Sequence, residues 1–254
     1  MHTIFLYIIL LLILLLPLLL LLIKKKVKVV PMSSLYKNLL LEHVPFYQQL
    51  PENKRPEFEN RVQLFLAQVK ITGTGTVVED IDRVLIAASA IIPIFNFPGW
   101  EYINLHEVLL YPDSFNHAFE QYGPYRDILG MVGTGVMNRI MILSQAELRQ
   151  AFSNETDKRN TAIHEFVHLI DVTDGAMDGV PSVVLDKKYI VPWLQLMQKE
   201  IALITENQSD INPYGATNQS EFFAVVSEYF FERPDMLKEN HPELYELLVK
   251  IFHR

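Results

Sequence analysis

One five-residue motif, His-Glu-Phe-Val-His, limits what this chain can fold into more than any other stretch of it. It lies in "NTAIHEFVHLIDVTDG", residues 160–175, whose Ile, Phe, Val and Leu side chains predict a helix buried in the core. His164 and His168 are four residues apart, so both lie on one face of that helix. Burying two imidazoles and a carboxylate without partners is costly. The fold must therefore bring a metal ion or further polar groups to this helix.

A zinc site is the chemistry that this spacing predicts. Two imidazoles one helical turn apart supply two of the four ligands of a tetrahedral zinc ion. Glu165 follows the first histidine directly and cannot share that ligand geometry, but it can reach a water molecule on the metal. That is the position of a general base in a zinc peptidase.

A third ligand has to come from another element, and a downstream segment offers two carboxylates. "NPYGATNQSEFFAVVSEYFFERP", residues 212–234, predicts a helix with Asn218 or Ser220 as its N-terminal cap. Glu221 and Glu228 are seven residues apart on a face that otherwise consists of Phe and Val. A carboxylate in those surroundings requires a metal, a histidine or an arginine as its partner.

Two long segments carry a resemblance to a known family. "HEFVHLIDVTDGAMDGVP" and "YGATNQSEFFAVVSEYFFERP" resemble the family of the Mlc titration factor, zinc peptidases of the gluzincin type that are distantly similar to anthrax lethal factor. A looser similarity extends over roughly residues 35–250 and leaves out the first 30. In that family one zinc ion is bound by both histidines of the motif and by a glutamate that opens the "EFFA" stretch, and a tyrosine seven residues before that glutamate lines the site. The matching residues here are His164, His168, Glu221 and Tyr214.

The resemblance also implies functions. It implies aminopeptidase-like hydrolysis of short peptide substrates, and it implies binding of a glucose-responsive transcriptional repressor. The second property leaves open a regulatory binding module in which the metal site is structural or idle. Because every residue that the chemistry needs is present, we expect a zinc metallopeptidase.

Helix geometry agrees with these assignments. Glu221 lies in the first turn of its helix, where the helix dipole favours a carboxylate. This position and the family resemblance together favour Glu221 over Glu228 as the metal ligand. Glu228 and Asp171 are candidates for accepting the free N–H of a ligand histidine. Tyr214 follows a proline in a loop, and its phenol either donates a hydrogen bond to a developing oxyanion or simply packs as an aromatic ring.

Other polar patterns are predicted to be structural. Asp174 and Asp178 belong to Asp-Gly pairs that form turns, and no calcium-loop spacing surrounds them. The "GTG" triplets at 73–75 and 133–135 lack the lysine and the spacing of a phosphate loop, so we expect turns there too. The remaining histidines share no common spacing and are predicted to be incidental.

The rest of the pattern predicts an α+β fold, dominated by helices, with a small sheet before the motif helix. The periodicity of apolar residues predicts that residues 32–70 are mostly helical and that a buried helix ends near Pro93. Segments 101–112 and 138–144 have the composition of strands. Ser144 with a glutamate three residues later predicts the cap of another helix.

An uncharged apolar run opens the chain. Residues 4–23, "IFLYIILLLILLLPLLLLLI", would form a helix about 30 Å long, which is the thickness of a bilayer core. A cleaved secretory signal is disfavoured because no Lys or Arg precedes the run, the run is long, and no small-residue cleavage site follows. Four lysines do follow it, and positive charge stays on the cytoplasmic side. We therefore expect residues 1–31 to anchor the protein in a bacterial inner membrane, with a catalytic domain, residues 32–254, in the cytoplasm.

The composition of the chain excludes cysteine chemistry and argues against binding to nucleic acid. The chain has no cysteine, so disulfides and cysteine-bound zinc are impossible. All 30 acidic residues follow residue 31, together with 18 of the 22 basic ones, so this part carries a net charge of −12. A domain of that charge has no electrostatic footprint for nucleic acid.

Overall fold

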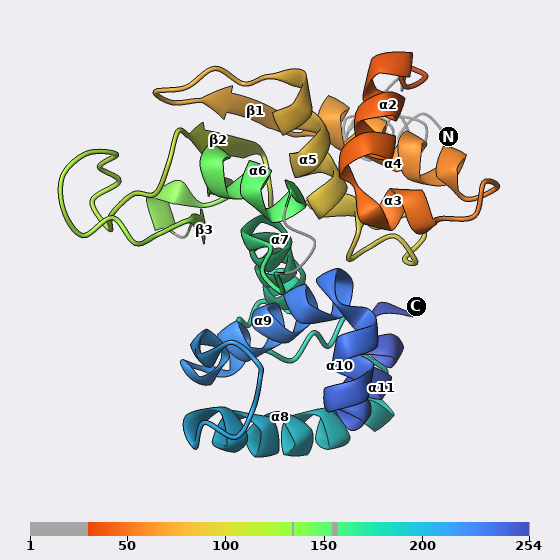
Figure 1. Ribbon diagram of the computed structural model, residues 1–254, viewed down its shortest axis with the longest axis vertical. Coiled ribbons are helices and arrows are strands. Elements are labelled where there is room, and N and C mark those ends of the chain that lie inside the picture. The colour runs from red at the N-terminus through yellow and green to blue at the C-terminus, as the bar shows by residue number, and fades with distance from the viewer. Residues whose placement is uncertain (1–29, 134, 154–156, 254) are drawn as a thin grey trace, which may run out of the picture.

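The computed structural model describes residues 30–133, 135–153 and 157–253, and it has an α+β fold rich in helices. The longer helices are α2 (Ser34–His43), α3 (Pro45–Gln49), α4 (Arg55–Gln68), α5 (Asp80–Ile91), α6 (Gln145–Ser153), α7 (Thr161–Asp171), α8 (Ile190–Thr205), α9 (Gln219–Glu232), α10 (Pro234–Asn240) and α11 (Pro242–Phe252). In Figure 1 the helices α2 to α6 lie above α7, and α8 to α11 lie below it. The motif helix α7 is therefore the connection between the two parts of the fold.

A small mixed sheet flanks α7. Its strands are β1 (Lys70–Gly73), β2 (Glu107–Tyr111), β3 (Gly130–Val132) and β4 (Ile140–Ser144). The order across the sheet is β1-β2-β4-β3. The pairs β1·β2 and β2·β4 are parallel, whereas the edge strand β3 runs antiparallel to β4. The sheet thus presents its one antiparallel edge next to α7, which packs against β3.

Both predicted strands are confirmed, but the described residues contain two further strands. Segments 101–112 and 138–144 contain β2 and β4. Neither β1 nor β3 was expected, because each is short and contains a glycine, which weakens the strand pattern. The parallel pairing also has no local signal, since it depends on segments that lie far apart in the chain.

Helix boundaries follow their capping residues. The Ser144 Oγ accepts a hydrogen bond from the Glu147 N–H at 3.2 Å, so the predicted cap of α6 is confirmed. At the start of α5 a reciprocal capping box joins Glu79 and Asp82. The buried helix expected to end near Pro93 is α5, which ends at Ile91.

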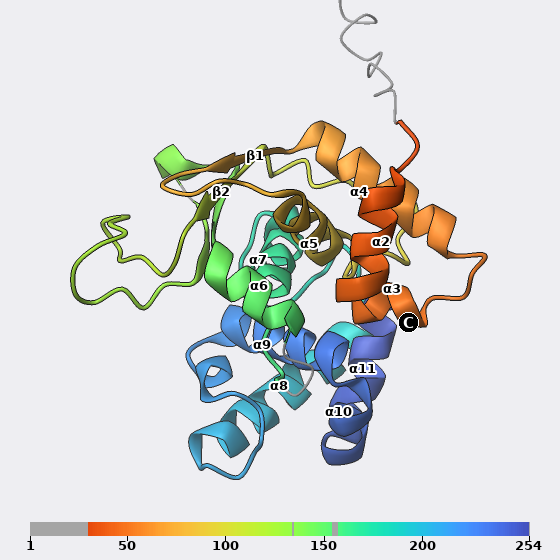
Figure 2. The ribbon, with the colours of Figure 1, turned by 45° about the horizontal axis from the view of Figure 1, so that its top comes forward.

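Aromatic side chains hold α7 in the core. The Phe166 ring lies 5.7 Å from the Phe65 ring and 5.2 Å from the Tyr102 ring, measured between centroids. Helix α7 packs against α5, α6 and α9, and in Figure 2 it lies next to α5 and α6 and above α9. A helix that is enclosed in this way keeps its polar side chains in fixed positions.

Within residues 30–133, 135–153 and 157–253, no helix has the length and hydropathy to cross a membrane. The predicted anchor, residues 4–23, lies outside the described part of the chain, as do the lysines that follow it.

Candidate metal centre

The motif forms a capped helix, as its pattern predicted. The Asn160 side chain accepts a hydrogen bond from the Ile163 N–H and so begins α7. His164, Glu165 and His168 are all buried, with exposed fractions of 9, 6 and 6 %. Three ionisable side chains are therefore enclosed within a single turn of the helix.

The structure brings these histidines together with Glu221 from α9. The Nε2 atom of His164 lies 2.9 Å from Glu221 Oε2 and 3.0 Å from the Nε2 atom of His168. His168 Nε2 lies 3.4 Å from the same carboxylate oxygen. One atom from each of three side chains thus points at a common position, and the three form a group compatible with a metal ion.

The remaining ring nitrogens have partners of their own. His164 Nδ1 lies 2.6 Å from Glu228 Oε1, and the other oxygen of Glu228 accepts the Asn160 N–H at 2.6 Å. His168 Nδ1 lies 3.1 Å from Ser220 Oγ, whose hydroxyl donates to Asp171 Oδ2 at 2.9 Å. Both imidazoles can therefore carry their proton on Nδ1, which leaves the Nε2 lone pairs directed at each other.

Two lone pairs 3.0 Å apart repel unless a cation lies between them. Zinc–nitrogen and zinc–oxygen bonds of about 2.0–2.2 Å place the ligand atoms of a tetrahedron about 3.3 Å apart. The observed separations of 2.9, 3.0 and 3.4 Å are close to that spacing. The donor set of two imidazoles and one carboxylate fits a zinc ion and leaves one position for a substrate or a water molecule.

The charges of the centre favour a cation as well. Burial lowers the pKa of the His164 imidazole, but the Glu228 and Glu221 carboxylates outweigh burial and raise that pKa to about 10. Burial raises the pKa of the Glu221 carboxyl, but its hydrogen bonds to His164 and His168 prevail and lower the pKa to about 2. The site therefore holds positive charge between its carboxylates, and a metal ion would displace a proton from it.

Glu165 lies against the edge strand and does not belong to the group of possible metal ligands. A Cβ atom placed on Gly130 of β3 would be 2.9 Å from Glu165 Oε1 and 2.8 Å from Glu165 Cγ. Only a glycine allows the strand backbone to approach this carboxylate so closely. Burial raises the pKa of Glu165 and outweighs the His164 and His168 charges, which act to lower it. A raised pKa makes the carboxylate a stronger base, as proton transfer requires.

Tyr214 lies at the open side of the centre. Its ring centroid is 6.0 Å from that of His164, and 54 % of the residue is exposed. Burial of part of the ring, together with the Glu221 and Glu165 charges, raises the pKa of its hydroxyl. The phenol therefore stays protonated at neutral pH and can donate a hydrogen bond to a group bound at the centre.

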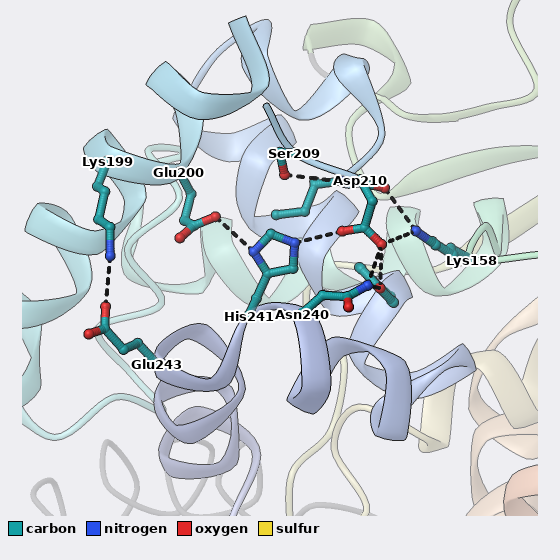
Figure 3. Close-up of polar contacts among 10 residues, drawn as sticks. Lys158, Lys199, Glu200, Ser209, Asp210, Asn240, His241 and Glu243 are labelled. Atoms are coloured by element: carbon teal, nitrogen blue, oxygen red, sulfur yellow. Dashed lines mark hydrogen bonds and ion pairs between the residues drawn. The ribbon is translucent and has the colours of Figure 1, made fainter. Parts of the chain in front are cut away.

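A polar cluster holds the segment that leads to Tyr214. The Asp210 carboxylate accepts hydrogen bonds from Lys158 at 2.5 Å, Tyr229 at 2.8 Å and Asn240 at 2.9 Å. Figure 3 shows His241 between two carboxylates, with Nε2 2.6 Å from Asp210 Oδ1 and Nδ1 3.0 Å from Glu200 Oε2. Lys158 precedes the cap of α7, so the cluster ties together the segments on both sides of the metal centre.

His241 was predicted to be incidental, and it takes no part in the metal centre. Burial lowers the pKa of its imidazole, but Glu200 and Asp210 prevail and raise it. A histidine that bonds two carboxylates at once is cationic, so its function in the fold is electrostatic. The sequence position of His241 relative to the other histidines could not reveal these contacts, because Asp210 and Glu200 are 31 and 41 residues away from it.

The aspartates after α7 form turns, as predicted, and one turn also supports α9. Asp174 accepts the Ala176 N–H and the Ser182 hydroxyl, and Asp178 accepts the Val180 N–H. Gly179 has a φ of +74°, and a Cβ atom on it would lie 2.2 Å from the Gln219 carbonyl oxygen.

The Gly179 N–H donates to Asp171 Oδ2, the same oxygen that accepts from Ser220. Asp171 therefore reaches His168 through Ser220 and not directly. From the sequence, Ser220 was only a possible cap, a position that Asn218 takes. Asn160 was not predicted to support the site, although an asparagine directly before a helix is a recognisable cap signal.

Comparison with known proteins gives one family. The sequence model of the family described as "Glucose-regulated metallo-peptidase M90" matches residues 21–253. An uncharacterized protein of a Synechocystis species is 32 % identical over 237 residues, covering 87 % of this chain and 84 % of the relative. Proteins named Mlc titration factor A are 28 % identical in Pectobacterium atrosepticum and 26 % identical in Escherichia coli, each covering 83 % of both chains.

Proposed function

Because the chain belongs to the glucose-regulated metallo-peptidase M90 family, we propose that it is a zinc-dependent peptidase with aminopeptidase-like activity on short peptides. One observation carries the proposal. Nε2 of His164, Nε2 of His168 and Oε2 of Glu221 converge within 3.4 Å of one another, and both Nδ1 atoms are already engaged. Such a group has the geometry of a three-ligand catalytic zinc site.

Each residue has a defined task in this proposal. His164, His168 and Glu221 hold the metal, which when bound supplies a Lewis acid for a peptide carbonyl and lowers the pKa of water. Glu165 takes a proton from the attacking water and returns it to the leaving amine. The Tyr214 hydroxyl donates a hydrogen bond to the oxyanion that develops on the substrate.

Residues around the metal ligands keep them in position. Glu228 accepts the Nδ1 proton of His164, and Ser220 accepts that of His168 with Asp171 behind it. This arrangement orients both rings and makes their Nε2 atoms better ligands. It also explains why α7 and α9 must pack against each other for the centre to form.

Metal content and hydrolysis together test the proposal. The purified protein should contain about one zinc ion per chain, and His164→Ala or Glu221→Ala should remove most of it. Glu165→Gln should keep the zinc and the fold but lower cleavage of a chromogenic aminopeptidase substrate by at least about 10². Full zinc in Glu221→Ala together with its loss in Glu228→Ala would instead make Glu228 the third ligand.

A regulatory function is the second candidate, because the relatives are named Mlc titration factor A. We propose that the protein also binds a transcriptional repressor, a partner to which a net charge of −12 in the soluble part offers an acidic surface. If this is the whole function, Glu165→Gln would leave repressor binding intact. Zinc-loaded wild-type protein would then cleave no member of a varied peptide library above the level of that variant.

Membrane attachment is part of the proposal and rests on the sequence alone. Residues 1–31 would form the anchor and basic segment, and residues 32–254 the cytoplasmic domain. A reporter fused after Arg254 should be active in the cytoplasm, and the full-length protein should stay with membranes after a salt wash. Alkaline phosphatase activity from that fusion would reverse the orientation, and release of a shortened protein would exclude the anchor.

A further inference from the structure

The position of Tyr214 at the metal centre is set by its backbone. The described part of the chain offers its hydroxyl no hydrogen-bond partner, and 54 % of the residue is exposed. The Tyr214 N–H donates to Asn212 Oδ1 at 3.0 Å, and the Tyr214 carbonyl oxygen accepts the Thr217 N–H at 3.1 Å. Gly215 packs against α9, where an added Cβ atom would lie 3.4 Å from Val225 Cγ1. The place of the hydroxyl therefore depends on how firmly this backbone segment is fixed.

One carboxylate fixes the connection between α8 and α9 that carries this segment. Asp210 Oδ2 accepts hydrogen bonds from Lys158 at 2.5 Å and from Asn240 at 2.9 Å. The same oxygen accepts from the Tyr229 hydroxyl at 2.8 Å, and Oδ1 lies 2.6 Å from His241 Nε2. Figure 3 shows Lys158, Asn240 and His241 converging on the carboxylate. Its partners belong to the segment before α7, to α9, to α10 and to the residue that joins α10 to α11, so one side chain binds the connection to four parts of the fold.

The Asp210 carboxylate stays ionised because two of its partners are cations. Burial raises the pKa of its carboxyl, but the hydrogen bonds to Lys158, His241 and Tyr229 prevail and lower that pKa below its usual value. His241 itself is held as a cation between Asp210 and Glu200 of α8. Charge-assisted hydrogen bonds are about twice as strong as neutral ones. The connection is therefore anchored by charge, four residues before the proposed oxyanion donor.

Building on the proposed function of Tyr214, we propose that Asp210 is a positioning residue that places the Tyr214 hydroxyl for the oxyanion and affects turnover only through that hydroxyl. The chain between the two has few ways to absorb a displacement. Ile211 is buried, with 1 % exposed, and Asn212 accepts the Tyr214 N–H and so begins the 3-10 helix η4 (Pro213–Ala216). A misplacement of about 1 Å in a reacting group costs on the order of 10²-fold in rate. Loss of the anchor should therefore lower kcat.

A double-mutant cycle in the full-length, zinc-loaded protein in detergent tests this inference. Asp210→Asn should lower kcat about tenfold. KM and zinc content should not change, because the hydrogen-bond partners of Asp210 among the described residues include no metal-ligand candidate. In a Tyr214→Phe background the same substitution should lower kcat less than about twofold, since no hydroxyl remains to be misplaced. An equal loss of kcat in both backgrounds, or a loss of zinc, would overturn the inference.

Two further variants complete the comparison. His241→Gln removes one cation from Asp210 and keeps a donor there, so it should lower kcat in the same Tyr214-dependent way if Asp210→Asn does not fold. Lys199→Met is the matched control, because it breaks the exposed ion pair with Glu243 at 2.9 Å and leaves the bonds of Asp210 in place. The control should keep the wild-type kcat.

Amide hydrogen exchange tests the positioning without hydrolysis. Asp210→Asn should speed exchange in residues 211–217 at least about tenfold, while exchange in α7 changes less than about twofold. Equal acceleration in α7 would mean that Asp210 only stabilises the fold, and unchanged exchange in 211–217 would mean that it does not fix the segment, so either result overturns the inference. A wild-type protein that cleaves no peptide, or a Tyr214→Phe variant with wild-type kcat, would instead refute the proposed function. The exchange of residues 211–217 would still decide whether Asp210 fixes this segment.

Discussion

Gly130 is the residue whose substitution should move the proposed general base without touching the metal ligands. In Gly130→Ala the new Cβ atom would lie 2.7 Å from Thr161 Cγ2, 2.8 Å from Glu165 Cγ and 2.9 Å from Glu165 Oε1. Ordinary contact begins at 3.4 Å. The Glu165 side chain must therefore retreat by about 0.6 Å, because the strand backbone is held in the sheet.

The size of the effect follows from this displacement. A misplacement of about 1 Å in a reacting group costs on the order of 10²-fold in rate, so a shift of about 0.6 Å should lower turnover about tenfold or more. The same crowding should reduce the free energy of unfolding by about 1–3 kcal/mol, as overpacking does. Zinc content should remain at one ion per chain, since the atoms that the new methyl group meets belong to Thr161 and Glu165 and not to a ligand.

Steady-state hydrolysis, metal analysis and urea unfolding measure these three quantities. The control is the double variant Gly130→Ala/Thr161→Ser, which removes the Thr161 methyl contact and keeps its hydroxyl. The double variant should regain stability but not turnover, because the contact with Glu165 persists. Wild-type turnover in Gly130→Ala, or recovery of turnover in the double variant, would refute the assignment of Glu165 as the group that the glycine positions.

Three further outcomes are expected. Glu228→Gln should lower the free energy of unfolding of the metal-free protein, measured in urea, by about 1–3 kcal/mol. The reason is that one amide oxygen cannot accept from both the His164 Nδ1–H and the Asn160 N–H. An unchanged free energy of unfolding would mean that the two bonds do not act together. His241→Gln should lower the free energy of unfolding by about 1–2 kcal/mol at pH 6 and by less at pH 9. A histidine whose pKa is raised by folding stabilises the fold fully below a pH of about 6.5, and this stabilisation disappears as the pH passes the raised pKa. An equal loss at both pH values would contradict a cationic His241. Tyr214→Phe should lower kcat about 10–100-fold with little change in KM, since the hydroxyl acts on the transition state; a rise in KM alone would make it a substrate-binding residue.

Local patterns were sufficient to predict the residues of the candidate metal centre. The apolar period and the His–Glu spacing predicted α7 because residues four apart must share a helix face, whatever the rest of the chain does. The first-turn position of Glu221 and the deeper position of Glu228 likewise follow from helix geometry and from the family resemblance. In the structure Glu221 lies beside both Nε2 atoms and Glu228 lies beside His164 Nδ1, while their roles as ligand and supporting residue stay predictions.

The supporting contacts could not be predicted because they join segments that are far apart. Ser220 meets Asp171 across 49 residues, and His241 meets Asp210 across 31. No periodicity links such pairs, and each residue alone has the pattern of a surface or turn side chain. The approach of Gly130 to Glu165 has the same character, since it exists only because β3 turns back as the edge of a sheet whose other strands are parallel.

Asn160 joins the start of α7 to the residues that support the metal centre. Its backbone N–H donates to Glu228, its side-chain amide donates to Glu232, and its side-chain oxygen begins α7. Glu228 also bonds His164 Nδ1, so one carboxylate serves both the cap of α7 and the orientation of a candidate metal ligand. Coupling is reciprocal in free energy, so a metal ion that strengthens the bond between His164 and Glu228 should stabilise the cap by the same amount by which an intact cap strengthens metal binding.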